Sequence, residues 1–353
     1  MPSTQTKVPA YNILLTGGAG FLGKAILHEL LGKDALIPVN LVKVLDLKPM
    51  ASISDPRISF IQGDVRDSAL LDKSCMDIDL VIHSAAIVDW GTKSREEIMS
   101  VNYQATLNAI EAARANGVKA LVFTSSLDVL FDGKPLKNVN EETPYPASHS
   151  TSYCESKYLA ELAVLEANDD QLRTSIIRPS DIYGEGDPYH IGSLIQMARG
   201  GFYVRLGNGQ SLCQHVYVRN VAHAHIGVSK ALLNGHPGVD GQAYFITDGP
   251  ASNFFTFFDR FVEGAGYRIW PKNIWLPRCL AYSMGCVSEA VAFLWRPIKK
   301  YSPKMSRFAV TYTCTDYTFG SDKARLGFGF APKYSREESF ERTVDYFRKK
   351  ANQ

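Results

Sequence analysis

A tyrosine and a lysine lie four residues apart in the segment Tyr153-Cys-Glu-Ser-Lys157. On a helix this spacing places both side chains on one face, one turn apart. A neighbouring ammonium, helped by a positively charged nicotinamide, would lower the pKa of the phenol toward neutrality. A phenolate formed near neutral pH is a competent general base for an alcohol. The pair is common on exposed helices, so this interpretation depends on a cofactor site elsewhere in the chain.

A glycine-rich segment, Gly17-Gly-Ala-Gly20-Phe-Leu-Gly23, directly follows the apolar run Ile13-Leu-Leu-Thr16. Its glycines fit two registers, Gly17/Gly20/Gly23 and Gly18/Gly20/Gly23. Either register allows a tight turn, a close backbone approach to a pyrophosphate, and a helix N-terminus whose free N–H groups face the phosphates. Tight turns also use glycine for steric reasons alone. The strand-like run before the loop and the helical pattern after it favour dinucleotide binding.

An aspartate ends the next apolar run, Val44-Leu-Asp46, and lies 23 residues beyond Gly23. This spacing fits an acid that binds the adenine ribose hydroxyls, and its charge would repel a 2′-phosphate. The sequence therefore favours NAD over NADP, although Lys43 and Lys48 leave NADP open. Asp64, which follows the third apolar run, could accept a hydrogen bond from the adenine amine.

Ser126 closes the segment Val122-Phe-Thr-Ser-Ser126. A hydroxyl at the carboxyl end of a strand points into the cleft where α/β proteins bind ligands. Ser126 could therefore hydrogen-bond the reacting oxygen, with Ser125 or Thr124 as substitutes. The same hydroxyl could instead satisfy the last backbone groups of the strand.

The elements that must position these residues alternate between short apolar runs and helical patterns. This alternation predicts an α/β fold with a Rossmann-type, doubly wound parallel sheet. Strands are expected at 13–16, 41–46, 58–62, 80–83, 121–124 and 175–178, and helices at 21–31, 95–116 and 153–167. Beyond Pro179 the alternation fails, which indicates a smaller, mostly C-terminal substrate lobe. We expect a flexible N-terminus at 1–10, an NAD-binding domain at 11–182 to which 212–248 return, and a substrate-binding lobe at 183–211 and 249–348.

Together, these motifs resemble the extended short-chain dehydrogenase/reductase family: Thr16-Gly17-x-x-Gly20-x-x-Gly23, Ser126 and Tyr153-x-x-x-Lys157. Four further segments are similar to its 3β-hydroxysteroid dehydrogenase/isomerase branch, which includes enzymes like sterol 4-carboxylate 3-dehydrogenase: Ile82-His-Ser-Ala-Ala-Ile-Val-Asp89, Arg95-Glu-Glu-Ile-Met-Ser-Val-Asn102, Arg178-Pro-Ser-Asp-Ile-Tyr-Gly184 and His215-Val-Tyr-Val-Arg-Asn-Val-Ala-His-Ala-His225. The similarity spans about Tyr11 to Phe347. Arg219 departs from the branch, which usually carries an acid there, and could alter the hinge between the lobes.

The resemblance implies NAD-dependent oxidation of the 3β-hydroxyl of a steroid or sterol. In that chemistry Tyr153 removes the hydroxyl proton, Lys157 holds the nicotinamide ribose, and Ser126 fixes the substrate oxygen. Asn102 orders the central helix and a proton-relay water. NAD contacts are implied at Gly17, Gly20, Phe21, Leu22, Gly23, Asp46, Asp64, Val65, Ser84, Ala85, Ala86, Tyr153, Lys157 and Pro179.

Several functions stay open within and beside this interpretation. Oxidation could be followed by double-bond isomerisation, which needs another acid or base that the sequence does not identify. It could instead be followed by loss of carbon dioxide from a 4-carboxysterol, because a 3-ketone β to a carboxylate decarboxylates readily. The alternatives are an NADPH-linked reductase of a long-chain β-keto acid or flavonoid-like ketone, and a non-catalytic dinucleotide-binding protein.

The composition excludes some classes of partner. The 353 residues include 38 Lys and Arg against 36 Asp and Glu, a net charge of +2, so gross charge gives no nucleic-acid footprint. Six cysteines without a Cys-x-x-Cys pair predict free thiols in a reducing compartment. His223 and His225 point apart on a helix, so no metal is expected. No signal peptide or run of about 20 apolar residues is evident, and we expect a cytoplasmic protein that could form a homodimer.

The C-terminal third contains an amphipathic helix, expected over 276–295. Apolar residues at Leu280, Met284, Val287, Val291 and Leu294 follow the helical period. Five basic residues without an acid follow at Arg296, Lys299, Lys300, Lys304 and Arg307. An apolar face joined to a basic run is typical of peripheral membrane contact, here through 276–307. Packing of this helix on the protein's own core is the favoured alternative.

Aromatic residues are dense in the expected substrate lobe. They favour a bulky lipid alcohol over a charged sugar nucleotide, for which only Arg205 and Arg219 could hold a diphosphate. The pocket is expected to be lined by Tyr183, Tyr189, Phe254, Phe255, Phe257, Phe258, Trp270 and Trp275.

Overall fold

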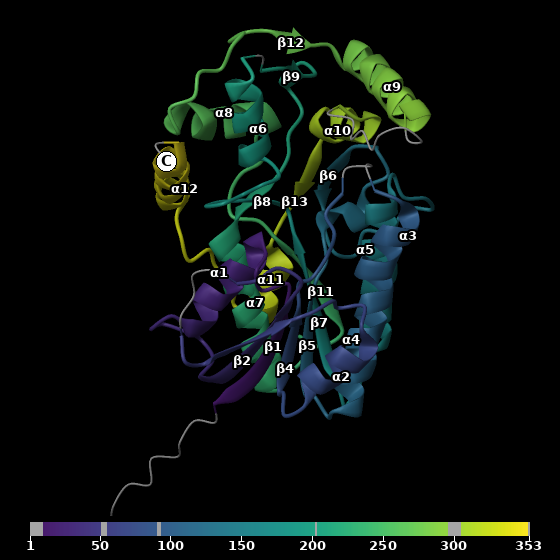
Figure 1. Ribbon diagram of the computed structural model, residues 1–353, viewed down its shortest axis with the longest axis vertical. Coiled ribbons are helices and arrows are strands. Elements are labelled where there is room, and N and C mark those ends of the chain that lie inside the picture. The colour runs from purple at the N-terminus through teal and green to yellow at the C-terminus, as the bar shows by residue number, and fades with distance from the viewer. Residues whose placement is uncertain (1–9, 51–54, 90–92, 202, 296–304, 352–353) are drawn as a thin grey trace, which may run out of the picture.

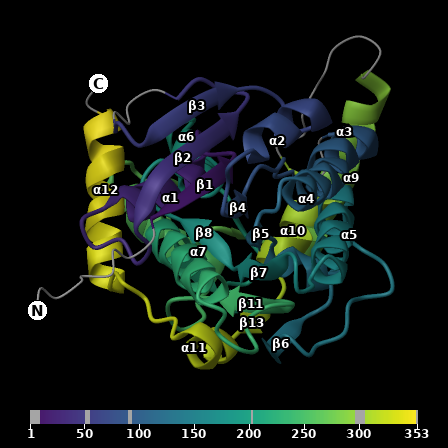
Figure 2. The same cartoon turned by 90° about the horizontal axis from the view of Figure 1, so that it is seen from below.

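The centre of the protein is a seven-stranded parallel sheet in the order β11-β7-β5-β4-β1-β2-β3 (Figure 2). The computed structural model describes residues 10–50, 55–89, 93–201, 203–295 and 305–351. All six predicted strands are confirmed within this sheet, and the predicted α/β, doubly wound class is confirmed with them. The strands are β1 (Tyr11–Thr16), β2 (Val39–Asp46), β3 (Ile58–Gln62), β4 (Leu80–His83), β5 (Ala120–Thr124), β7 (Arg173–Pro179) and β11 (Gln242–Ile246).

Helices cover both faces of the sheet, which is why its strands are apolar on both sides. In β1, Ile13 and Leu15 face one core and Leu14 faces the other, and all three are buried. One face carries α1 (Phe21–Leu31) and α7 (Val218–Leu233). The other carries α2 (Ser68–Cys75), α4 (Ala105–Ala115) and α5 (Ser152–Glu166) (Figure 2). The chain crosses from one side of β1 to the other at β4, so the glycine loop after β1 lies at the switch point, where ligands bind.

The helix expected over 95–116 is interrupted. It consists of α3 (Arg95–Met99), a π-helical turn η1 (Ser100–Gln104) and α4. Within η1, Asn102 is buried and its side chain bonds the loop after β4: Ile87 N donates to Asn102 Oδ1 over 2.7 Å, and Asn102 Nδ2 donates to Ile87 O over 2.9 Å. Asn102 Nδ2 also lies 3.0 Å from Ser156 Oγ on α5. The π turn thus ties the cavity-lining loop to α5.

The smaller lobe lies above the carboxyl edge of the sheet (Figure 1). Three two-stranded sheets brace it, β8 with β10, β9 with β12, and β6 with β13. In contrast, α11 packs against β11 and α7, so this part of 249–348 lies on the central sheet. The remaining elements are η2 (Leu127–Leu130), β6 (Leu136–Val139), β8 (Asp181–Tyr183), α6 (Ile191–Arg199), β9 (Arg205–Leu206), β10 (His215–Tyr217), α8 (Phe254–Gly264), β12 (Trp275–Leu276), α9 (Arg278–Trp295), α10 (Arg307–Thr313), β13 (Tyr317–Phe319), α11 (Asp322–Phe328) and α12 (Arg336–Ala351).

The apolar face of α9 is exposed, which makes the favoured core-packed interpretation wrong. Val287 is 64% exposed and Leu294 is 70% exposed, whereas the residues of α9 that are buried are the small Ala281, Gly285 and Ala292. The small residues let α10 approach closely: a Cβ on Gly285 would lie 3.0 Å from Arg307 N. The basic positions from 296 to 304 lie outside the described residues.

A buried ion pair fixes α5 to the sheet. Arg178 on β7 is 3% exposed and Glu161 on α5 is fully buried; Arg178 Nε lies 3.1 Å from Glu161 Oε1, with a second, shorter contact through Nη2. Tyr145 donates to the same carboxylate over 2.6 Å. Because α5 carries Tyr153 and Lys157, the Arg178–Glu161 ion pair helps to fix the position of these two residues relative to the sheet.

We predict that Glu161→Gln lowers the free energy of unfolding by about 3–5 kcal/mol, because it leaves the buried Arg178 charge without its partner. Urea denaturation followed by circular dichroism measures the loss. Lys134→Ala, which removes an exposed ion pair with Asp132, is the control and should cost less than about 1 kcal/mol. Equal effects of the two changes would contradict the anchoring role of the buried pair.

Candidate active site

A cavity of about 640 Å³ lies at the carboxyl edge of the sheet. Its walls come from the loops after β1, β2, β4 and β5, from α5, from the end of β7, and from α10 of the smaller lobe. The structure brings together here all the residues that the sequence predicted for catalysis or NAD binding: Gly17, Gly20, Phe21, Leu22, Gly23, Asp46, Asp64, Val65, Ser84, Ala85, Ala86, Ser126, Tyr153, Lys157 and Pro179.

The glycine loop forms a cradle with no room for side chains. Gly17 has φ of +73°, and a Cβ there would lie 2.8 Å from the backbone of Ala85. A Cβ on Gly23 would lie 2.1 Å from Gly17 O. The N-cap of α1 is Gly20, which has no side chain to cap the first N–H groups of the helix. These N–H groups can face the pyrophosphate of a dinucleotide, so the loop fits NAD.

Asp46 is fixed beside this cradle. Its Oδ2 accepts a hydrogen bond from Ala19 N over 3.0 Å, and its Oδ1 accepts one from Lys48 N over 2.9 Å. The carboxylate therefore stands at the end of β2, where an adenine ribose would lie. Asp64 also faces the cavity, and its ion pair with Arg66, 2.5 Å long, lowers its pKa. Asp64 thus remains an acceptor, but it shares its oxygens with Arg66.

Lys157 is held inside the protein by the strand below it. The side chain is 3% exposed, and Nζ donates to Thr124 O over 2.6 Å and lies 4.5 Å from the ring centre of Phe123. Burial lowers the pKa of Lys157 to about 7. Its charge is therefore easily lost near neutral pH.

Tyr153 does not have the lowered pKa that the sequence predicted. It is 7% exposed, and burial raises its pKa well above the ordinary value. The Asp128 carboxylate raises it further, while a hydrogen bond with Ser126 opposes the shift. The prediction included a positively charged nicotinamide and stays a prediction for the protein with NAD bound. In the protein alone, Lys157 directs its ammonium to Thr124 O and is itself destabilised by burial.

Asp128 is the acid of the site that our sequence analysis missed. Ser126 Oγ donates to Asp128 Oδ2 over 2.8 Å and accepts from Asp128 N over 3.2 Å, capping the short helix η2. Burial raises the pKa of Asp128 to about 7. The signal was a Ser-x-Asp turn directly after a strand, in which the acid returns to the serine.

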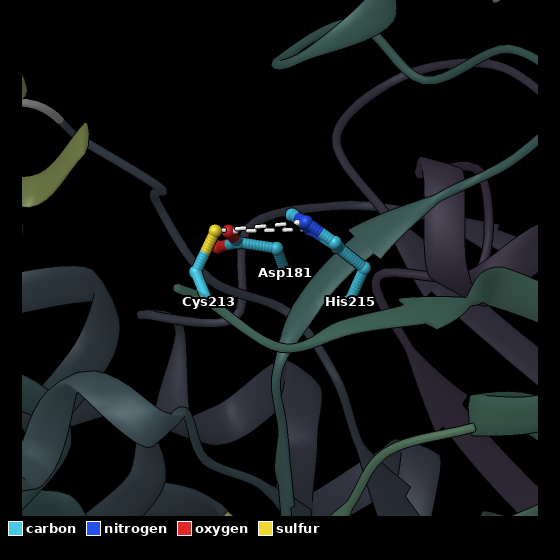
Figure 3. A group of neighbouring side chains, drawn as sticks. All are labelled: Asp181, Cys213 and His215. Atoms are coloured by element: carbon cyan, nitrogen blue, oxygen red, sulfur yellow. Dashed lines mark hydrogen bonds and ion pairs between the residues drawn. The ribbon is translucent and has the colours of Figure 1, made fainter. Parts of the chain in front are cut away.

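Asp181, which lines the cavity, belongs to a polar cluster with Cys213 and His215 (Figure 3). Asp181 accepts hydrogen bonds from Tyr312 Oη over 2.6 Å and from Tyr317 Oη over 2.9 Å. Cys213 and His215 turn toward it, with 3.6 Å between Cys213 Sγ and His215 Nε2. Burial raises the pKa of the thiol and lowers that of the imidazole. The Asp181 carboxylate thus has two hydrogen-bond donors, and the Cys213 thiol donates a hydrogen bond to Ser252 O over 3.3 Å.

Two other sequence expectations concern His225 and the aromatic residues. His225 Nε2 lies 2.8 Å from Thr124 Oγ1, so this histidine supports the strand below Lys157. Of the aromatic residues expected around the substrate, Tyr189 lines the cavity. Phe308 and Tyr312 of α10 line it as well. The prediction is wrong for the other expected aromatic residues, which pack in the core of the smaller lobe or lie at its surface: Tyr183, Phe254, Phe255, Phe257, Phe258, Trp270 and Trp275. The phenylalanines of α8 miss the cavity because this helix packs against α6 and α12.

Hydride transfer from an alcohol requires a dinucleotide site beside a group that handles the hydroxyl proton, and the cavity holds residues for both. The chain is thus a short-chain dehydrogenase/reductase, an NAD-dependent oxidoreductase that acts on hydroxyl groups. Within this class it belongs to the 3-beta hydroxysteroid dehydrogenase/isomerase family, whose profile matches residues 14–278.

Relatives with this assignment match nearly the whole chain. A mouse 3 beta-hydroxysteroid dehydrogenase type 7 is 33% identical over 96% of this chain and 96% of its own. A mouse sterol-4-alpha-carboxylate 3-dehydrogenase (decarboxylating) is 32% identical over 94% of this chain and 89% of its own. Among solved structures, an epimerase from Methanothermobacter thermautotrophicus superposes with a TM-score of 0.76 at 19% identity, covering 98% of this chain and 94% of that one. A dTDP-glucose 4,6-dehydratase from Streptomyces venezuelae superposes with a TM-score of 0.74 at 21% identity, and the match covers 96% of this chain and 98% of that one. The solved structures share the fold.

We predict that Gly17→Ala weakens NAD binding at least about tenfold, a change of about 1.4 kcal/mol, because the new methyl group meets the Ala85 backbone and displaces the loop. Gly117→Ala is the matched control, since Gly117 has φ of +67° and open space around its Cβ. Isothermal titration with NAD measures both. An unchanged dissociation constant in folded Gly17→Ala protein would contradict the cradle.

Proposed function

We propose that this protein oxidises the 3β-hydroxyl of a steroid or sterol with NAD, with Tyr153 taking part in removal of the hydroxyl proton. The convergence of Ser126, Tyr153 and Lys157 on one cavity, next to the glycine cradle, carries the proposal. The names of the relatives support the substrate class. Asp46 supports NAD over NADP, because a 2′-phosphate would meet its carboxylate.

Arg205 of the smaller lobe and Arg219 of α7 argue against a sugar nucleotide. Arg205 pairs with Asp259 over 2.7 Å, and Arg219 lies 3.4 Å from Glu185. Both side chains are therefore engaged within the protein and are poorly placed to hold a diphosphate. Apolar groups supply much of the cavity wall beyond the catalytic residues, as a steroid skeleton requires: Ile87, Val88, Leu127, Ile182 and Phe308.

Bound NAD would supply a nicotinamide ring that accepts hydride. The protein's own part is to hold the alcohol oxygen between Ser126 and Tyr153 and to accept its proton as the C–H bond breaks. Lys157, fixed to Thr124 O, would bind the ribose hydroxyls from below. A 4-carboxysterol oxidised in this way would lose carbon dioxide without a further catalytic residue. Isomerisation of a double bond would need a further acid or base.

We predict that the protein reduces NAD in the presence of a 3β-hydroxysteroid or a 4-carboxysterol, measured by NADH absorbance. Tyr153→Phe should lower the rate at least about 100-fold, because it removes the phenol that handles the proton. Tyr189→Phe, which removes another phenol of the cavity wall, should retain most of the rate. The mass of the product distinguishes simple oxidation, isomerisation and loss of carbon dioxide.

Turnover that survives Tyr153→Phe would contradict the mechanism. Tight NAD binding without oxidation of either sterol would contradict the substrate assignment. Turnover only with NADP and a long-chain β-keto acid or flavonoid-like ketone would identify the protein as a reductase of that class. Tight NAD binding without turnover of any of these compounds would favour a non-catalytic dinucleotide-binding protein.

We further propose that α9 docks this protein on an anionic lipid surface from which the sterol enters. Its exposed apolar side chains and the basic residues between 296 and 307 support this partner. No helix within the described ranges is both long and apolar enough to cross a membrane, so the contact would be peripheral. Helix α10 lies beside α9 (Figure 1). Its Arg307 pairs with Glu289 of α9 over 2.6 Å, and its Phe308 and Tyr312 line the cavity. Docking through α9 would bring the cavity close to the lipid.

We predict that the double variant Val287→Glu/Leu294→Glu lowers flotation with vesicles containing phosphatidylserine at least about tenfold, because it places two charges on the apolar face. Leu326→Glu on α11 is the control, since Leu326 is 77% exposed and lies on a different element. Equal flotation of the variant and the control would contradict docking through α9. Dissociation of a dimer in the double variant, seen by analytical ultracentrifugation, would assign this face to a second copy of the chain.

A further inference from the structure

Asp128 is a buried carboxylate in direct contact with a residue of the proposed reaction. Its Oδ2 accepts the Ser126 hydroxyl over 2.8 Å. Ser126 and Tyr153 line the same cavity, and the Ser126 hydroxyl acts to lower the pKa of the phenol. Among the described residues none donates a hydrogen bond to Asp128 Oδ1, which is also buried. Asp128 is thus a carboxylate with free acceptor capacity at the end of a short chain of hydroxyl groups.

The surroundings of Asp128 oppose its negative charge. Burial raises its pKa to about 7, the nearby Asp181 acts in the same direction, and Ser126, His190 and Lys157 act against it. Besides the Ser126 hydroxyl of its own turn, titratable groups of α5, β8, the loop before α6 and α10 interact electrostatically with Asp128: Tyr153, Cys154, Lys157, Asp181, His190 and Tyr312. A proton can therefore be gained or lost at Asp128 near neutral pH.

The phenol of Tyr153 needs such an acceptor. Its pKa is raised well above the ordinary value, so the protein alone holds Tyr153 as a neutral phenol at neutral pH. A neutral phenol can take the proton of an alcohol only if it passes its own proton on. Ser126, which acts on the pKa of this phenol from the same cavity wall, has its hydroxyl directed at Asp128 Oδ2.

We propose that Asp128 is a positioning residue that receives the hydroxyl proton of the oxidised alcohol through Tyr153 and Ser126. The inference rests on the proposed oxidation of an alcohol and adds the residue at which its proton is held. Asp128 also orients Ser126: the serine donates to the Asp128 carboxylate and accepts from Asp128 N, which leaves one lone pair for a hydrogen bond from Tyr153.

The protons balance along this chain. The alcohol O–H bond breaks and its proton joins Tyr153 Oη, as the Tyr153 proton moves to Ser126 Oγ and the Ser126 proton moves to Asp128 Oδ2. The C–H bond electrons leave the substrate as hydride to the NAD of the established class. Tyr153 and Ser126 end as neutral hydroxyl groups, Asp128 ends as a carboxylic acid, and its proton is later released to water.

The protonation state of Asp128 also sets the role of Ser126. With ionised Asp128, Ser126 donates to the carboxylate and accepts from the alcohol side. With protonated Asp128, the acid donates to Ser126 Oγ, and the Ser126 hydroxyl is free to donate to a ketone oxygen. Oxidation therefore requires ionised Asp128, and its kcat should rise with pH through a value near 7.

Asp128→Asn tests the inference, because the amide oxygen can still accept the Ser126 hydroxyl but cannot take its proton. We expect kcat to fall about 100-fold, KM for the sterol to change less than about twofold, and the rise of kcat near pH 7 to disappear. Asp181→Asn, which neutralises a second buried acid of the same cavity, should keep a rise but move it to lower pH, because the Asp181 charge no longer raises the pKa of Asp128. Asp128→Glu restores a carboxylate and should recover part of kcat together with the rise.

A readout without substrate accompanies the kinetics. In the infrared spectrum of the wild-type protein, a protonated carboxyl band should grow as the pH falls through about 7, and Asp128→Asn should lack it. Absence of that titrating band would overturn the inference whatever the substrate is. A wild-type pH rise retained in Asp128→Asn would overturn it as well. A wild type with the infrared band but no sterol turnover would instead overturn the proposed substrate and leave the proton site supported.

Discussion

Burial of ionisable groups between α5 and the carboxyl edge of the sheet is the constraint on which the site depends. Removing water from Lys157, Tyr153 and Asp128 favours the neutral form of each, so every charge there needs a fixed partner. Thr124 O provides one for Lys157, and Ser126 provides one for Asp128. These contacts keep their lengths only while α5 holds its position, which the buried Arg178–Glu161 pair secures.

The sequence predicts those parts of the fold that are governed by local rules. Buried parallel strands are short apolar runs, and a cradle for pyrophosphate excludes side chains, so β1 and its glycine loop are readable from residue types alone. The pKa shifts of Asp128 and Tyr153 cannot be predicted in this way, because both depend on how completely α10 and the smaller lobe exclude water. The exposure of α9 could not be predicted either. A helical apolar stripe looks the same whether it meets its own core or a different partner.

The solved structures of similar fold include enzymes named for sugar nucleotides, at 21% identity or less for those compared. This chain shares their fold, so a difference in substrate depends on the side chains around the cavity. Here Arg205 of the smaller lobe and Arg219 of α7 pair with internal acids, and Phe308 and Tyr312 of α10 line the cavity. The same sheet can thereby present one cofactor to chemically unlike alcohols.

The π turn η1 has a consequence for how this helix can change. Such a turn holds one residue more than a regular α-helix would at the same place, and each residue of an α-helix advances the chain by about 100°. Deleting one residue between 100 and 104 would convert the turn to regular α-helix and leave the rotation of α4 unchanged. Straightening the turn with all of its residues kept would instead rotate all of α4 by about that angle. The small residues that α4 now buries, Ala105, Ala109 and Ala113, would turn away from the core. Asn102 would lose its two hydrogen bonds to the backbone of Ile87 in the loop after β4. The π turn therefore fixes the rotation of α4 about its own axis, and a straight helix with the same residues would lose that orientation.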